Sequence, residues 1–383
     1  MKNLKYFVLI LCIFFFPFSV FAVNITDKLS ISGSVTTLYQ WLRMSNGYVD
    51  EEREDRTKDR GSAVIDFNIS FRPTESNEFF LRASFAKGSG FHSESSLYPF
   101  KLNSYADDLF VDLKNINAHG RDHLQELWYS HRFEIKEKIF IKFTGGIIDS
   151  TAFIDDNVFA ADELGQFMNE ALVHNPLANL VSYDVGVAGE FEWDRFHFRL
   201  VGMRSKVEDS DGRNYNWVGA QVGYKVVTEL GEGNYRLYGY RTNKRFDNWD
   251  GDSYEALKGI GVSFDQQLIK EALGAFFRAG LQDSSAVVDY NRMVSFGINI
   301  NGSVWGRKDD EIGVGYAYLR SPSRNEELKS SQVFEGYFKF KLFSLKTITS
   351  DITFDYQYIR DRVRESENNK SGYVYGVRWN LHF

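Results

Sequence analysis

The sequence contains almost no cysteine and little proline. Cys12 is the only cysteine and lies inside an apolar N-terminal stretch, so the rest of the chain can form neither a disulfide nor a thiolate metal site. Only five of the 383 residues are proline. After the N-terminal stretch no apolar run is long enough for a membrane-spanning helix, which excludes a helical integral membrane architecture for the rest of the chain.

Basic charge is not in excess either. The chain has 45 Lys and Arg residues against 52 Asp and Glu residues, for a formal net charge of -7 at pH 7. No basic patch for nucleic acid stands out, so we expect no nucleic-acid partner. Aromatic residues, by contrast, make up 16% of the sequence. Many aromatics without long apolar runs suit a β-barrel, because each of its membrane strands is half polar.

The N-terminal stretch has the form of a secretory signal peptide. Two lysines precede an apolar run over residues 6–16, and small residues follow up to Ala22. We expect cleavage after Ala22, which divides the chain into a signal peptide, residues 1–22, and one domain, residues 23–383. A retained membrane helix is the alternative, and the shortness of the run disfavours it.

The C-terminal stretch alternates with a period of two. Every odd position from Tyr373 to Phe383 is apolar or aromatic, and Arg378 and Asn380 lie between them. This period places the two sets on opposite faces of a strand. The pattern suits a strand with one face in lipid and the other in water, closing a barrel whose terminal aromatic lies at the interfacial girdle.

The same alternation recurs along the chain. Strands are expected near residues 29–40, 63–72, 79–85, 124–134, 139–148, 182–191, 195–204, 216–227, 234–242, 257–265, 272–282, 292–301, 311–320, 332–342, 350–360 and 372–383. The even number and the spacing predict an all-β fold, a transmembrane up-and-down antiparallel β-barrel of about 16 strands. No linker or composition shift indicates a second domain.

Two long interruptions break the alternation, at residues 88–122 and 149–181. In the first, residues 105–116 favour a short helix or turn. In the second, residues 161–172 have helical spacing, with Leu164, Phe167, Met168 and Leu172 on one side. Because this apolar set needs a surface to pack on, we expect the second loop to fold into the lumen and constrict it. The alternative is an outward loop that makes subunit contacts.

The expected size of the barrel indicates its class of function. A barrel of about 16 strands is too wide for its own side chains to fill, so it encloses an aqueous channel. Charged and polar residues at inward positions agree, because they are tolerated there only in contact with water. The inward set is Asp66, Arg72, Arg82, Glu126, Arg132, Lys142, Asp184, Glu190, Arg195, Arg199, Gln221, Arg278, Asn299, Lys339, Asp355 and Arg378. It mixes both signs of charge, so we expect weak ion selectivity.

Three stretches resemble the OprB family of carbohydrate-selective porins: residues 145–176, 305–318 and 334–361. The first carries an acidic pair before the helical segment and an Asn-Pro stop. The resemblance implies passive, substrate-biased diffusion of mono- or oligosaccharides across the outer membrane of a Gram-negative-type bacterium. It also implies contact with outer-membrane lipid, recognition of the last strand, ending at Phe383, by the barrel-assembly machinery, and a possible homotrimer.

A sugar-selective constriction calls for charge and aromatic faces. Sugar hydroxyls donate and accept hydrogen bonds, and aromatic rings stack on the C–H faces of the sugar ring. The candidate residues on strands are Arg82, Glu126, Trp128, Arg132, Lys142, Arg195, Arg199, Arg236 and Tyr238, and those on the second loop are Asp162, Glu163 and Gln166. We expect the three loop residues to approach Arg132, Lys142, Arg195 and Arg199 as a gate of opposite charges.

Other functions have weaker support in the sequence. His119 and His123 are spaced like metal ligands but have no third ligand near them, and the acidic residues between 155 and 163 lack the alternating ligands of a calcium loop. We therefore predict no metal, no cofactor and no catalytic residue. No nucleophile elbow or phosphate-binding glycine loop supports an outer-membrane enzyme. A pore for other small solutes, or an export channel for an acidic polysaccharide, remains the alternative.

Overall fold

The computed structural model describes residues 23–92, 98–105, 116, 123–207, 212–365 and 368–383. The expected signal peptide therefore lies outside the described residues. So does almost all of the helix or turn expected over residues 105–116.

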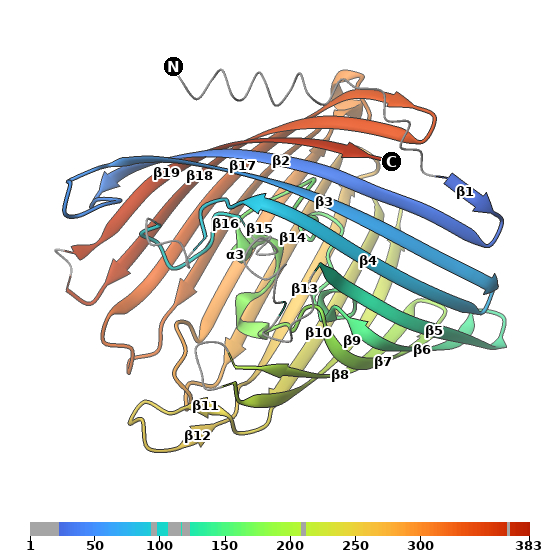
Figure 1. Ribbon diagram of the computed structural model, residues 1–383, viewed down its shortest axis with the longest axis horizontal. Helices are drawn as coiled ribbons and strands as arrows, with labels where there is room; N and C mark the ends of the chain where they lie inside the picture. The colour runs from blue at the N-terminus through green and yellow to red at the C-terminus, as the bar shows by residue number, and fades with distance from the viewer. Residues whose placement is uncertain (1–22, 93–97, 106–115, 117–122, 208–211, 366–367) are drawn as a thin grey trace.

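The chain forms a closed ring of 16 antiparallel strands, as the alternation predicted (Figure 1). Each strand pairs with the next one along the chain, and β19 pairs with β2 to close the ring. The strands are β2 (Leu29–Asn46), β3 (Thr57–Thr74), β4 (Asn77–Gly88), β5 (Leu124–Lys136), β6 (Ile139–Ile148), β7 (Asp184–Trp193), β8 (Phe196–Lys206), β9 (Asn214–Thr228), β10 (Gly231–Thr242), β13 (Lys258–Ile269), β14 (Leu273–Gln282), β15 (Arg292–Asn301), β16 (Glu311–Arg320), β17 (Leu328–Leu345), β18 (Ile348–Val363) and β19 (Lys370–His382).

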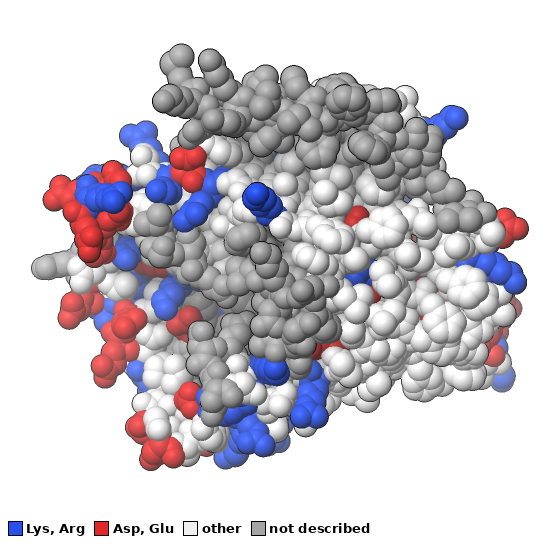
Figure 2. All heavy atoms as spheres, in the orientation of Figure 1, with Lys and Arg blue, Asp and Glu red and all other residues white. Residues whose placement is uncertain are grey.

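The outer wall is apolar over its middle and charged at its ends. Large exposed side chains such as Phe79, Phe143, Val187, Leu237 and Phe354 point outwards. Figure 2 shows a largely uncharged band on the visible face, with Lys, Arg, Asp and Glu gathered towards the two ends. This pattern is typical of strands that face lipid. Within the described residues, no helix is long and apolar enough to cross a membrane.

The two ends of the barrel differ in their connections. At the end where Phe383 lies, most connections are two-residue turns, several with a left-handed residue such as Lys138, Asp194 or Lys346, and the longest, residues 302–310, contains η4 (Gly302–Trp305). The opposite end carries the longer loops, one of which contains the hairpin β11 (Phe246–Asp247) and β12 (Tyr254–Glu255). Short periplasmic turns and longer extracellular loops are the usual arrangement in outer-membrane barrels. The long-loop end is therefore the extracellular end.

The short β1 strand (Val23–Thr26) forms a hairpin with β2 beside the C-terminal end of the chain. The backbone of Phe383 exchanges two hydrogen bonds with Gly33, at 2.8 and 3.0 Å. A Cβ added to Gly33 would lie 2.6 Å from the Phe383 ring. The terminal aromatic thus covers a glycine on the neighbouring strand at the seam where the barrel closes.

The segment between β6 and β7, residues 149–183, lies inside the barrel, and we call it the inner loop (Figure 1). It contains three short helical pieces: η2 (Ser150–Ala152), α3 (Glu170–Val173) and η3 (Pro176–Ala178). Phe167, Met168 and Leu172 are fully buried, as the need for a packing surface predicted. Phe167 meets the rings of Phe276 and Tyr337 at 5.4 and 5.0 Å, edge to face.

The helix expected over residues 161–172 is wrong. Only the four residues of α3 are α-helical, and residues 163–165 form a turn. The Asp162 carboxylate accepts hydrogen bonds from the backbone N–H groups of Leu164 and Gly165, at 3.1 and 2.9 Å. Such a local side-chain bond offers the backbone an alternative to helix. The apolar spacing reflects packing on several strands rather than on one helical face.

Residues 89–92 and 98–105, between β4 and β5, also lie in the lumen, which the sequence did not predict. The Gln40 side chain of β2 accepts from the Phe91 backbone N–H at 2.8 Å, and the Lys101 N–H donates to Asp361 of β18 at 2.9 Å. Phe91, Phe100 and Leu102 are buried. Residues 89–92 and 98–105 thus lie against β2 and β18.

Candidate functional site: a charged lumen narrowed by the inner loop

The inner loop is fixed to the β14 wall by a fully buried ion pair. Asp155 lies 3.1 Å from Nε of Arg278, and neither side chain is exposed to solvent. Nη1 of Arg278 also donates to the Leu172 carbonyl at 2.6 Å, and the second Asp155 oxygen accepts from the Asn175 N–H at 2.6 Å. Burial raises the pKa of Asp155, and the Arg278 guanidinium opposes that rise.

The adjacent carboxylate, Asp156, meets two other strands. It lies 3.2 Å from Nη1 of Arg199 on β8 and 2.9 Å from Nε of Arg236 on β10. Arg236 is also paired with Asp265 of β13 at 2.6 Å. Burial favours the protonated acid, but the two guanidinium groups outweigh it and hold the pKa of Asp156 below its ordinary value. Asp156 is therefore charged in neutral water and bridges strands on one side of the lumen.

A second anchor lies on the opposite side of the inner loop, at β17 and β19. The Glu335 carboxylate accepts from the backbone N–H groups of Met168 and Asn169, at 2.5 and 2.9 Å. Arg378 donates to the carbonyl oxygens of Glu163 and Gln166, both at 2.5 Å. The inner loop is thus held across the lumen by charged groups on both sides.

These contacts correct the expected gate. Asp162, Glu163 and Gln166 lie beside β19 and do not approach Arg132, Lys142 or Arg199, because Arg378 holds the backbone of this turn. Asp156 takes the place expected for them opposite Arg199, and it also pairs with Arg236, which was not part of the expected gate. Arg195 is not an inward residue, since it lies exposed in the turn between β7 and β8. The carboxylates that face the arginines of the barrel wall are therefore Asp155 and Asp156, not Asp162 and Glu163.

The inner loop leaves part of the β3 to β6 wall in contact with water. Arg82 on β4 is 34% exposed at its side chain and lies 3.0 Å from Glu126 on β5, which is 10% exposed. The indole N–H of Trp128 donates to the other Glu126 oxygen at 3.0 Å, and the Trp128 ring stacks on Phe80 at 4.9 Å. Asn68 of β3 accepts from Nε of Arg82 at 3.0 Å. We call these five side chains the open wall: Asn68, Phe80, Arg82, Glu126 and Trp128.

The open wall combines the two kinds of group that bind a sugar. The Arg82, Glu126 and Asn68 side chains offer donors and acceptors in fixed positions, and the stacked Phe80 and Trp128 rings offer an apolar face. Phe80 was not among the residues that we predicted. Its inward position, in phase with Arg82 two residues later, is the signal that could have identified it.

Charged side chains continue the open wall towards the end with short turns. Lys142 of β6, 32% exposed at its side chain, lies 3.3 Å from Glu190 of β7, which is also 3.5 Å from Arg199. The Arg132 guanidinium lies over the Phe140 ring at 4.0 Å. Both signs of charge therefore face this part of the lumen.

Two other predicted residues lie beneath the inner loop instead of beside open water. Tyr238 is 2% exposed, and its hydroxyl accepts from the Asn175 side chain at 2.7 Å. Arg236 is 4% exposed and is occupied by Asp156 and Asp265. In this conformation both residues hold the inner loop in place.

The described residues do not gather into a metal site. No cluster of three or more His, Cys, Asp or Glu side chains suited to a metal ion occurs among them, and His119 lies outside them. His123 stacks on Phe85, with ring centroids 4.6 Å apart. The acids considered for calcium are separated, because Asp155 and Asp156 bind arginines while Asp162 caps its own turn.

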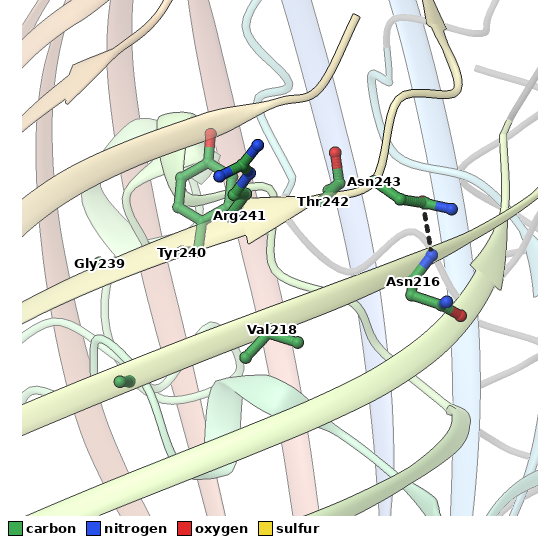
Figure 3. A pocket seen from close by; sticks show the side chains of 8 residues that line it. Asn216, Val218, Gly239, Tyr240, Arg241, Thr242 and Asn243 are labelled. Carbon is green, nitrogen blue, oxygen red and sulfur yellow. Dashed lines mark hydrogen bonds between the residues drawn. The ribbon is translucent and has the colours of Figure 1, made fainter.

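A shallow recess between β9 and β10 lies outside this path. Figure 3 shows Val218, Gly239 and Arg241 around it, with the Asn216 N–H donating to the Asn243 side chain at 2.9 Å. Val218 is 49% exposed, whereas its neighbour Trp217 is fully buried on the lumen side. The recess is therefore a feature of the outer wall.

Comparison with known proteins agrees with this architecture. A family model described as carbohydrate-selective porin, OprB family, matches residues 83–383. A relative from Aquifex aeolicus (strain VF5), described as an uncharacterized protein, is 31% identical over 328 residues, which cover 85% of this chain and 90% of that protein.

Solved structures share the fold at low sequence identity. The high-pH structure of Pseudomonas putida OprB has a TM-score of 0.71 at 13% identity and covers 93% of this chain and 94% of its own. The outer membrane channel DcaP of Acinetobacter baumannii has a TM-score of 0.51 at 9% identity, with coverage of 93% and 97%. At such identities the likeness concerns the barrel alone.

Proposed function

Because the chain belongs to the OprB family of carbohydrate-selective porins, we infer that it is an outer-membrane porin through which carbohydrates diffuse passively into a Gram-negative bacterium. The observation that carries this inference is the closed barrel with a water-exposed, polar inner wall opposite an inner loop. A passive pore needs no nucleophile or cofactor, and the family and the fold favour a channel over an enzyme.

We place the constriction between the open wall and the inner loop. Support comes from the contrast in exposure, because Arg82 retains 34% of its side-chain surface while Arg278, beneath the loop, retains none. A sugar passing here can exchange water for the Arg82 and Glu126 side chains and stack on Trp128. Arg132, Lys142 and Arg199 continue the path.

Liposome swelling tests this function. Proteoliposomes should swell faster in mono- and oligosaccharides than in amino acids of similar size, whereas equal rates would favour the alternative, a pore for other small solutes. Trp128→Ala should weaken block of the ion current by sugar about 2- to 12-fold, which corresponds to about 0.5–1.5 kcal/mol of aromatic contact. Trp193→Ala, on the outer wall at 59% exposure, is the matched control and should change nothing.

Processing and assembly complete the proposal. Cleavage after Ala22 leaves residues 23–383 as the barrel, and N-terminal sequencing of the purified protein checks this. The closing seam at Phe383 and Gly33 supports recognition of the last strand by the barrel-assembly machinery. A homotrimer is the proposed assembly, to be measured by native mass spectrometry.

A further inference from the structure

Four arginines lie on the outer face of the barrel near the extracellular ends of neighbouring strands. They belong to β15, β16 and β18, and we call them the arginine row: Arg292, Arg320, Arg360 and Arg362. Their chain neighbours Met293, Leu319 and Asp361 are buried on the lumen side. Because successive side chains of a strand point to opposite faces, the arginines point outwards.

The strand register brings the arginine row together. Arg292 is directly opposite Arg320, and Ser330 of β17 is opposite both Arg320 and Arg362. Arg360 lies one outward position closer to the middle of the barrel than Arg362. At a strand spacing of about 4.8 Å, the row extends over about 14 Å of the outer wall.

No acid in the described part of the chain neutralises the arginine row. None of its guanidinium groups forms an ion pair with a described carboxylate, whereas Lys258 on the same face is paired with Asp283 at 3.6 Å. Nε of Arg362 is buried and has no hydrogen-bond partner. Like charges directly opposite each other destabilise a sheet. The arrangement therefore favours binding of an anion from outside the chain.

Strand length shows where the row lies relative to a membrane. β15 (Arg292–Asn301) and β16 (Glu311–Arg320) have 10 residues each, which is the number that a tilted strand needs to cross the hydrocarbon core. Arg292 begins β15 and Arg320 ends β16, so both lie at the extracellular ends of these strands. The outward aromatic residues Phe296 and Tyr316 lie midway along them, and Arg292 is about 10 to 13 Å further out than Phe296 for a tilted strand. The arginine row is thus at headgroup level on the extracellular side.

We propose that the arginine row binds the phosphate groups of a phosphorylated outer-leaflet lipid. Guanidinium groups bind phosphate through paired N–H donors, and several in a row fit a headgroup with more than one phosphate. The acyl chains of the same lipid would lie on the apolar wall below, around Phe296 and Phe334. Each arginine near a charged surface contributes about fivefold in affinity.

Lipid titration of the purified barrel in a neutral detergent tests the proposal. Native mass spectrometry would count molecules of bisphosphorylated lipid A bound to the wild type and to the double variant Arg292→Gln/Arg320→Gln. The expected loss of affinity is about 25-fold. Arg292→Lys/Arg320→Lys keeps both charges and should bind far better than the Gln variant. The control Lys138→Gln/Lys225→Gln removes the same charge from exposed ion pairs at the opposite end and should bind like the wild type.

Further binding measurements distinguish a lipid phosphate from free inorganic phosphate. Dephosphorylated lipid A should bind weakly to the wild type, and millimolar inorganic phosphate should not displace the phosphorylated lipid. Equal binding of both lipids, displacement by inorganic phosphate, or the same loss in the control variant would each overturn the proposal. A change of subunit number in Arg292→Gln/Arg320→Gln, with lipid binding intact, would instead make this face an interface between copies and also overturn it.

Discussion

Replacing Arg278 with methionine should release the inner loop from the β14 wall. The substitution removes the partner of Asp155 and the donor to the Leu172 carbonyl, and leaves a carboxylate where no solvent reaches. Methionine fills much of the same volume, so the main change is the loss of charge. The other anchor, at Glu335 and Arg378, stays intact.

The magnitude follows from the burial of the pair. Removing one partner of a buried ion pair costs about 3–5 kcal/mol. If the loop alone bears that cost, its docking equilibrium shifts roughly 160- to 4,600-fold towards the released state. A released loop obstructs the lumen less, so single-channel conductance in planar bilayers should rise and fluctuate. Lys225→Gln, which breaks an exposed pair with Glu232, should leave conductance unchanged.

Docking of the inner loop in Arg278→Met should depend on pH, in a direction set by Asp155. Without Arg278, burial raises the pKa of Asp155 in the docked loop above its value of about 3.9 in water, so the docked loop binds the proton more tightly. Docking of the variant should be restored at acidic pH and lost as pH rises through that raised pKa. Asp155→Asn/Arg278→Met should dock near the wild-type level with no such dependence. A folded Arg278→Met protein with wild-type conductance at neutral pH would refute the anchoring role.

Three other perturbations test separate parts of the molecule. Shortening residues 157–168 should raise conductance and blur sugar preference, whereas unchanged conductance with loss of the oligomer would assign the segment to subunit contacts. Asp156→Asn should shift reversal potentials in a salt gradient towards anions, because Arg199 and Arg236 lose their shared carboxylate; an unchanged potential would remove this cluster from the ion path. Deleting Phe383 should reduce the yield of heat-modifiable barrel in outer-membrane fractions, because its bonds to Gly33 close the seam, and an undiminished yield would contradict that role.

The strands were predictable because each one shows its own alternation of apolar and polar residues. Residues 311–320 and 292–301 were placed at the ends that β16 and β15 have. The ends of β2 and β17 were placed short, since they extend to 18 residues beyond the apolar band, where alternation is no longer required. The need of Phe167, Met168 and Leu172 for a surface likewise predicted that the inner loop folds into the lumen.

The partners of the loop charges could not be predicted. Which acid meets which arginine depends on the path of the inner loop between β6 and β7. Arg378 fixes that path by donating to backbone carbonyl oxygens. Because every residue has a backbone carbonyl, no side chain in the sequence indicates these contacts. The position of residues 89–92 and 98–105 in the lumen was missed for the same reason, because Gln40 accepts from a backbone N–H there, that of Phe91. Arg195 was assigned inwards because it lies in a two-residue turn that the alternation of apolar and polar residues does not reveal.

Thiol accessibility tests most directly the claim that the pore runs between the open wall and the inner loop. With Cys12 in the expected signal peptide, single cysteines can be introduced into a mature barrel that has none. Asn68→Cys, beside Arg82, should react quickly with a bulky charged thiol reagent and lose conductance, while Thr353→Cys, fully buried beneath the inner loop on β18, should not react. If Thr353→Cys reacted quickly and lost conductance while Asn68→Cys did not react, the claim that the pore runs between the open wall and the inner loop would be contradicted.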